Sequence, residues 1–220
     1  IMPPLTPAVL ALSIASAITY LFQLRNPPSL SRATTKTAST SLLSLLASLQ
    51  HSPTPLTLAL ALGSLGDAFL AYDSDAAFLR GLTSFLIAHL FYIQLFTQQH
   101  GGALPTLDVI FSDTGYTAAA GGLASVVLLQ LVVLLPRVPR DLRLPVLVYT
   151  LTIFTMGVAA TAVRVNRGQV LTGALLFTAS DAILAADRFL VSPGSSLRAG
   201  MQYAVWVLYY SGQLLIALGF

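Results

Sequence analysis

Apolar residues run along this chain in long blocks that are separated by short polar stretches. A helix that crosses a bilayer needs about 20 mostly apolar residues, and most of the blocks approach that length. The pattern therefore predicts an all-α polytopic membrane bundle of about eight transmembrane helices. The blocks are roughly Leu5–Leu24, Thr35–Leu49, Pro55–Tyr72, Arg80–Phe96, Gly115–Leu135, Leu144–Val163, Gly168–Leu190 and Arg198–Gly219.

The polar stretches between the blocks are rich in turn-forming residues, as in "RNPPSLSR" (25–32) and "VSPGSS" (191–196). Residues 98–113 form the only long stretch. Short connections favour antiparallel neighbours, so we expect one integral membrane domain over residues 1–220 and no soluble domain. The first 24 residues are uncharged and lack the basic start of a secretory signal, so we expect them to form the first span.

The composition agrees with a membrane location. Only 9% of the residues are charged and the mean hydropathy is +0.80, whereas soluble domains carry about 25% charged residues. The chain has no cysteine, which excludes disulfides, thiolate catalysis and cysteine metal sites. The net charge of +3 comes from basic residues at block ends, so we expect a bilayer as partner and no nucleic acid.

The basic residues are distributed unevenly between the two sides of the predicted bundle. With eight spans, only Arg164 and Arg167 of the 11 basic residues lie on one side. Basic residues collect on the cytoplasmic side of membrane proteins. The bias therefore predicts that both termini are non-cytoplasmic, and we expect an endomembrane such as the endoplasmic reticulum. The other side carries Arg25, Arg32, Lys36, Arg80, Arg137, Arg140, Arg143, Arg188 and Arg198.

Three ionisable residues lie well inside apolar blocks: Asp67 in "GDAFLA", His89, and Asp181 in "SDAILA". A charged residue costs roughly 2.5–3.5 kcal/mol or more at the bilayer centre, so such residues usually face a cavity or a partner. Counting from the block ends places all three about 7–14 Å from the same membrane face. We therefore expect them to line one polar cavity as catalytic residues.

Other side chains could share that cavity. Lys36 enters from the same face, and we assign Tyr92, Tyr149, Tyr209 and Gln213 to its lining as substrate-binding residues. Each of these aromatic and amide groups could equally be a packing residue or an interface anchor.

Purely structural roles are open for the three deep residues as well. Asp67 could pair with Lys36 or Arg80, Asp181 could pair with Arg188, and His89 could be a core histidine. The remaining acids are interpreted as loop or helix-end charges, namely Asp73, Asp75, Asp108, Asp113, Asp141 and Asp187.

The histidines argue against a metal site. His51 and His100 fall in connections on the opposite side, which leaves only His89 at the right depth. Catalytic zinc usually takes three protein ligands. We therefore expect no metal and no cofactor.

The echo between "GDAFLA" and "SDAILA" joins the third block to the seventh, with the same direction through the membrane. It could mark an ancient parallel duplication. The alternative is that this pattern arises easily in helices rich in Ala and Leu.

Four segments occur in a familiar order: "LGSLGDAFLA", "GLTSFLIAHLFYIQLF", "GALLFTASDAILAADRF" and "VLYYSGQLL". Together they resemble the lysoplasmalogenase family of multi-pass membrane proteins, the YhhN type. The resemblance implies hydrolysis of the vinyl ether bond of lysoplasmalogens, a plasmalogen-derived lysophospholipid class. The products would be a fatty aldehyde and glycerophosphoethanolamine or glycerophosphocholine.

That reaction suits the expected cavity. Two carboxylates in one poorly solvated site repel, so one stays protonated and can donate a proton while the other balances the oxocarbenium ion that forms. His89 would relay a water proton and Lys36 would meet the substrate phosphate. Which Asp has which role stays open. The competing hypotheses are a proton-coupled small-molecule transporter that uses the same Asp and His residues, and a structural membrane protein.

Overall fold

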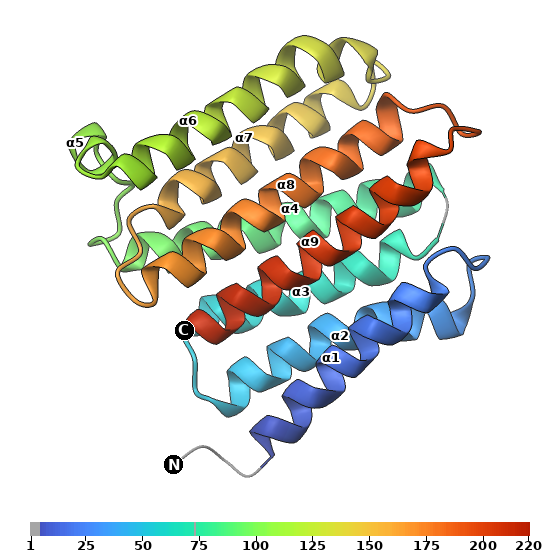
Figure 1. The fold of residues 1–220 in the computed structure, drawn as a ribbon, viewed down its shortest axis with the longest axis horizontal. Coiled ribbons are helices and arrows are strands. Elements are labelled where there is room, and N and C mark those ends of the chain that lie inside the picture. Colours follow the sequence, from blue (N-terminus) through green and yellow to red (C-terminus); the bar gives the residue numbers. More distant parts are fainter. Residues whose placement is uncertain (1–4, 73) are drawn as a thin grey trace. The chain divides into compact units, whose positions relative to one another are not determined.

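The structure is a computed structural model that describes residues 5–72 and 74–220, and every regular element in those ranges is helical. The chain forms two compact units, residues 1–95 with Phe220 and residues 96–219. Each unit is described by itself, and the ribbon is drawn in Figure 1.

Three helices and most of a fourth make up the first unit: α1 (Thr6–Gln23), α2 (Leu30–Leu49), α3 (Thr54–Leu70) and α4 (Asp75–Gln98). Consecutive helices pack side by side, and α2 lies against both α1 and α3 (Figure 1). Buried hydroxyls tie neighbours together, since Ser44 of α2 donates to the Thr57 carbonyl at 2.9 Å and Ser84 of α4 to the Leu62 carbonyl at 2.7 Å. Such bonds suit a membrane bundle, where no water competes for the carbonyls.

Gly66 lets α3 and α4 approach closely. A Cβ at this position would lie 2.6 Å from the ring of Phe85. The residue next to Asp67 is therefore glycine for a packing reason, and the close contact fixes the position of α3 beside α4.

The second unit holds a short helix, α5 (Leu107–Phe111), and then α6 (Thr114–Leu129), α7 (Arg143–Ala160), α8 (Arg167–Phe189) and α9 (Leu197–Gly219). The four longer helices pack in chain order, α6 on α7, α7 on α8 and α8 on α9. The backbones of α8 and α9 approach closely, because a Cβ on Gly212 would lie 2.8 Å from the Gly173 carbonyl oxygen. Two small residues thus bring the two backbones together.

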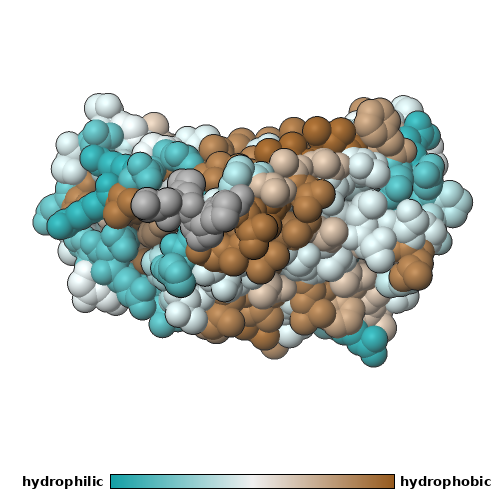
Figure 2. All heavy atoms as spheres, turned by 90° about the horizontal axis from the view of Figure 1, so that it is seen from below, coloured by the Kyte–Doolittle hydropathy of each residue, from teal (hydrophilic) through white to brown (hydrophobic). Residues whose placement is uncertain are grey.

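The helices suit a bilayer. Among the described residues, five helical stretches are long and apolar enough to cross one: Thr6–Gln23, Asp75–Gln98, Thr114–Arg137, Arg143–Ala160 and Arg167–Phe189. The third consists of α6 together with a π-helical turn (Gln130–Leu134) and a 3-10 turn (Leu135–Arg137) that continue it. Large apolar side chains point outward, as with Phe22 of α1, which is 82% exposed. Figure 2 shows a face on which hydrophobic side chains gather in the middle and hydrophilic ones lie toward the ends. The protein is an integral membrane bundle, which confirms the predicted fold class.

Each predicted block coincides with one of the long helices, but some bounds were wrong. The second helix begins at Leu30 and not at Thr35, because Ser29 caps it by accepting from the backbone N–H of Arg32. Residues 107–111 form a helix within the stretch predicted as a connection. The number of helices that cross the membrane, the single domain and the orientation stay predictions, and Asp73 lies outside the described residues.

Candidate functional site

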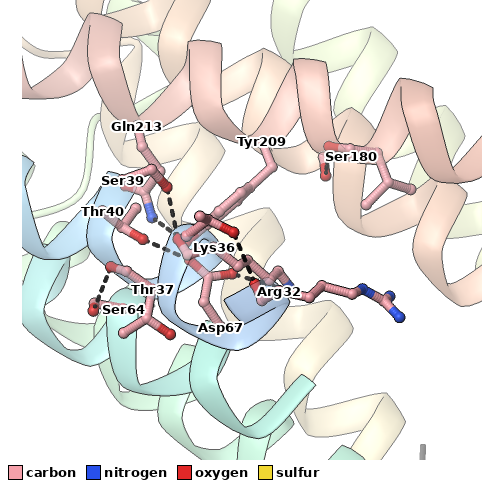
Figure 3. A network of polar contacts seen from close by, with 12 residues as sticks. Arg32, Lys36, Thr37, Ser39, Thr40, Ser64, Asp67, Ser180, Tyr209 and Gln213 are labelled. Atoms are coloured by element: carbon pink, nitrogen blue, oxygen red, sulfur yellow. Dashed lines mark hydrogen bonds and ion pairs between the residues drawn. The ribbon is translucent and has the colours of Figure 1, made fainter. Parts of the chain in front are cut away.

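Asp67 forms an ion pair with Lys36 in the first unit. The Lys36 ammonium lies 3.5 Å from Oδ1 of Asp67, and the two side chains are 11% and 2% exposed. Figure 3 shows Lys36 of α2 and Asp67 of α3 pointing toward each other. The pairing that the sequence left open as a structural role is therefore present, and it links α2 to α3.

Two further groups contact this pair. Thr40, one turn after Lys36, donates its hydroxyl hydrogen to Oδ2 of Asp67 at 2.6 Å (Figure 3). The Lys36 ammonium also lies 5.9 Å from the ring centroid of Tyr20 in α1, within range of a cation–π contact. Three helices thus supply groups to one buried ion pair.

His89 is fully buried in α4 of the same unit, and its ring orientation is set by the backbone. Nδ1 lies 2.6 Å from the Phe85 carbonyl oxygen, one turn earlier. A carbonyl can only accept, so Nδ1 carries the hydrogen and Nε2 holds the lone pair of the neutral ring. Tyr92, one turn further along α4, is also fully buried.

Asp181 lies in α8 of the second unit, where it is half-buried. The hydroxyl of Tyr149 in α7 donates to its carboxyl oxygen Oδ2. The contact between Asp181 and Tyr149 joins two of the residues that the sequence assigned to the site.

Tyr209 and Gln213, one turn apart in α9, belong to a buried aromatic cluster. Gln213 donates to the Tyr209 hydroxyl at 3.4 Å. Tyr209 meets the ring of Phe177 edge-on at 5.3 Å and that of Trp206 at 5.8 Å. The packing role that the sequence left open for Tyr209 is thus realised in the second unit.

Asp187 lies in the last turn of α8, the helix-end position that the sequence suggested. It is buried, and the guanidinium Nε of Arg198 lies 2.9 Å from its Oδ1. The pair clamps the end of α8 to the start of α9. The short connection folds Arg198 back onto Asp187, which spacing along the chain does not reveal.

The predicted site residues therefore fall into two sets. Lys36, Asp67, His89 and Tyr92 belong to the first unit, whereas Tyr149, Asp181, Tyr209 and Gln213 belong to the second. One cavity that unites Asp67, His89 and Asp181 stays a prediction. No group of three or more potential metal-ligating His, Cys, Asp or Glu residues occurs in the described part of the chain.

Sequence reasoning missed Thr40 and Tyr20. Thr40 is one of many hydroxyl residues in α2, and nothing in its local sequence distinguishes it. A signal was nevertheless present, because Thr40 follows Lys36 by four residues and so lies on the same face of the helix.

Comparison with known proteins places this geometry in a family. A family model described as the YhhN family matches residues 31–220. Lysoplasmalogenase from Mycobacterium bovis is 30% identical over 164 residues, which cover 74% of this chain and 58% of that protein. Lysoplasmalogenase TMEM86B is 32% identical over 165 residues in Homo sapiens and 34% over 164 in Sus scrofa, with 73% of this chain and 60% of each relative covered.

The chain thus spans 58–60% of the length of these curated relatives. No solved structure gives a significant match to it. Because the family model covers nearly all of the described helices, including every residue of the Lys36, Asp67 and Thr40 cluster, this chain belongs to the YhhN family.

Proposed function

We propose that this chain is a membrane-embedded hydrolase that cleaves the vinyl ether bond of lysoplasmalogens. The products are a fatty aldehyde and glycerophosphoethanolamine or glycerophosphocholine. The observation that carries the proposal is the similarity to proteins named lysoplasmalogenase, from 30% to 34% identical. The distribution of basic residues supports an orientation with both termini on the non-cytoplasmic side, and an endomembrane such as the endoplasmic reticulum is the proposed location.

The proposed reaction begins with a proton. A carboxylic acid donates it to the β-carbon of the vinyl ether, and the ether oxygen shares its lone pair with the α-carbon to give an oxocarbenium ion. Water adds to the α-carbon and loses a proton, which forms a hemiacetal. The hemiacetal then breaks its bond to the glycerol oxygen, which takes the hydroxyl proton. One water is consumed and nothing is oxidised or reduced.

The residues supply what each step needs. Of Asp67 and Asp181, one serves as proton donor and the other as stabilising anion, the two roles that carboxylate pairs have in glycosidases. His89 accepts the proton of the attacking water through Nε2, since the Phe85 carbonyl engages Nδ1. The proposal requires both carboxyls to reach one substrate.

Four further side chains are proposed to contact the lipid. They are Tyr92, Tyr149, Tyr209 and Gln213, which combine aromatic surface with a polar tip or an amide. Such groups suit a substrate that joins an apolar chain to a polar glycerol.

The deciding experiment uses the purified full chain in detergent micelles with a lysoplasmalogen as substrate. Aldehyde release is expected, and the matched 1-O-alkyl lysophospholipid, which lacks only the double bond, should stay intact because its saturated β-carbon cannot accept a proton. In deuterated water the aldehyde, trapped at once by reduction, should carry one deuterium on the carbon next to the carbonyl.

Two results would count against the proposal. Equal cleavage of the alkyl ether would exclude a mechanism based on protonation of the double bond. Proton-coupled solute flux in liposomes, without any aldehyde release, would favour the transporter instead.

A further inference from the structure

Two side chains of α2 hold the Asp67 carboxyl group from one side. Lys36 and Thr40 are four residues apart and therefore share a helix face. The ammonium lies 3.5 Å from Oδ1, and the Thr40 hydroxyl donates to Oδ2 at 2.6 Å. Each oxygen of the carboxyl group thus has a partner of its own.

Both contacts favour the ionised form of Asp67. Lys36 is 9% exposed and Asp67 1% exposed, so each charge is far more costly without the other. The Thr40 contact has the length of a hydrogen bond from a hydroxyl to a charged oxygen, about 2.5–2.7 Å. Because threonine is branched at Cβ, its hydroxyl is confined to few rotamers and can fix the orientation of the carboxylate.

We propose that Lys36 and Thr40 hold Asp67 as the resident anion of the site. Thr40 is then a positioning residue, and Lys36 is the counter-ion of Asp67 and not the ligand of the substrate phosphate that the sequence suggested. This inference rests on the proposed function for its catalytic meaning. Because the reaction needs one acid and one anion, the role of proton donor falls to Asp181.

Ser44 provides a matched control for Thr40. It lies one turn further along the same face of α2, and its hydroxyl also bonds across to α3. Its acceptor, however, is the Thr57 backbone carbonyl and not a carboxylate. Removing either hydroxyl loses one bond between α2 and α3, but only the Thr40 change alters Asp67.

The kinetic test compares Thr40→Val, Thr40→Ser and Ser44→Ala in the aldehyde assay. Thr40→Val should lower kcat by roughly 10–100-fold, the range expected for losing a hydrogen bond to a charged group. KM should change little, since the substrate is not contacted, and Thr40→Ser should restore most of kcat. An unchanged kcat in Thr40→Val, or an equal loss in Ser44→Ala, would overturn the role of Thr40.

A second test does not depend on enzymatic activity. Infrared spectroscopy of the purified protein detects the carbonyl stretch of a protonated carboxyl group, which a carboxylate lacks. The wild-type protein at neutral pH should show this band, Asp181→Asn should remove it and Asp67→Asn should keep it. Lys36→Met should add a second band that Lys36→Met/Asp67→Asn lacks.

A band that disappears in Asp67→Asn and persists in Asp181→Asn would assign the proton to Asp67 and overturn the inference. The spectra test the charge of Asp67 and the aldehyde assay tests the proposed function, so each hypothesis can be rejected without the other. The expected bands without aldehyde release would reject the proposed function and leave the charge of Asp67 established. Aldehyde release with the opposite bands would reject only the assignment made here.

Discussion

Lys36 changes the expected effect of substituting Asp67. From the sequence alone, Asp67→Asn should leave the protein folded, since asparagine is nearly the same shape. The structure shows that this change leaves the Lys36 ammonium, 3.5 Å from Oδ1, without its counter-charge. Breaking a buried pair in this way costs about 3–5 kcal/mol, so loss of activity in the single variant would not by itself identify a catalytic carboxylate.

The double variant Lys36→Met/Asp67→Asn separates the two roles of Asp67. Replacing a buried ion pair by neutral residues is often neutral or stabilising, so this protein should fold and elute normally on gel filtration in detergent. If Asp67 is the anion of the reaction, the folded double variant should still lose at least ~100-fold in aldehyde release. Near-normal activity would mean that the pair only holds α2 and α3 together.

Asp181 offers the cleaner single substitution. Its carboxyl oxygen Oδ2 accepts from the neutral Tyr149 hydroxyl, which can bond to an asparagine side chain as well. Asp181→Asn should therefore remain folded and lose at least ~100-fold in kcat if it donates the proton. Tyr149→Phe, which keeps the ring and removes the hydroxyl, serves as the comparison and should retain more activity. A fully active Asp181→Asn would disprove the acid–base mechanism.

Polar partners for Asp67 and Asp181 could be expected from the sequence, because a titratable residue is conspicuous in an apolar run. The roles of Thr40 and Tyr20 could not, since Thr40 is one of several hydroxyl residues in α2 and Tyr20 is one of several aromatic residues in apolar runs. Only the packing of α1 and α3 against α2 identifies them. Spacing within one helix predicts a shared face, but it does not predict which helix covers that face.

At the scale of elements, helix positions followed from the apolar blocks, whereas their ends depended on caps. Ser29 starts α2 and Asp113 starts α6, where its carboxylate accepts from the backbone N–H of Gly115 at 2.8 Å. Both caps lie in polar stretches that hydropathy marks only as breaks. The short helix α5 was missed because its five residues are too few to show a helical period of apolar positions.

The α8–α9 hairpin should depend on the pair between Asp187 and Arg198. Their side chains are 9% and 27% exposed, so the pair is only partly screened by solvent. Asp187→Asn should lower the stability by about 1–3 kcal/mol, seen as a lower Tm in detergent, while the folded fraction keeps its activity. Asp141→Asn, at an exposed position between α6 and α7, is the control and should leave Tm unchanged. Equal Tm values for both variants would contradict a stabilising role of the pair between Asp187 and Arg198.

At the scale of the whole molecule, each unit contributes chemistry of its own kind. The first provides an ion pair with a fixed anion, and the second provides a carboxyl group bonded to a tyrosine. The two carboxyls belong to the echoing segments "GDAFLA" and "SDAILA", and in both cases the partner lies on the preceding helix. This correspondence is what a parallel duplication would leave behind, although the partner residues differ.

The composition of α2 has a consequence for biogenesis. This helix carries Lys36 and many hydroxyl residues, and it is not among the helices apolar enough to cross a bilayer alone. A lysine opposes insertion by the translocon by up to roughly 2.5–3.5 kcal/mol at a helix centre, and Lys36 lies two turns inside α2. Asp67 of α3 can neutralise that lysine, so α2 should integrate efficiently only once α3 has been synthesised. In a glycosylation-reporter assay, α2 alone should pass into the lumen, whereas the α2–α3 hairpin should insert into the membrane. The Asp67→Asn change should make insertion of the hairpin less efficient. The order in which the ribosome delivers these two helices is then part of how the buried pair is made.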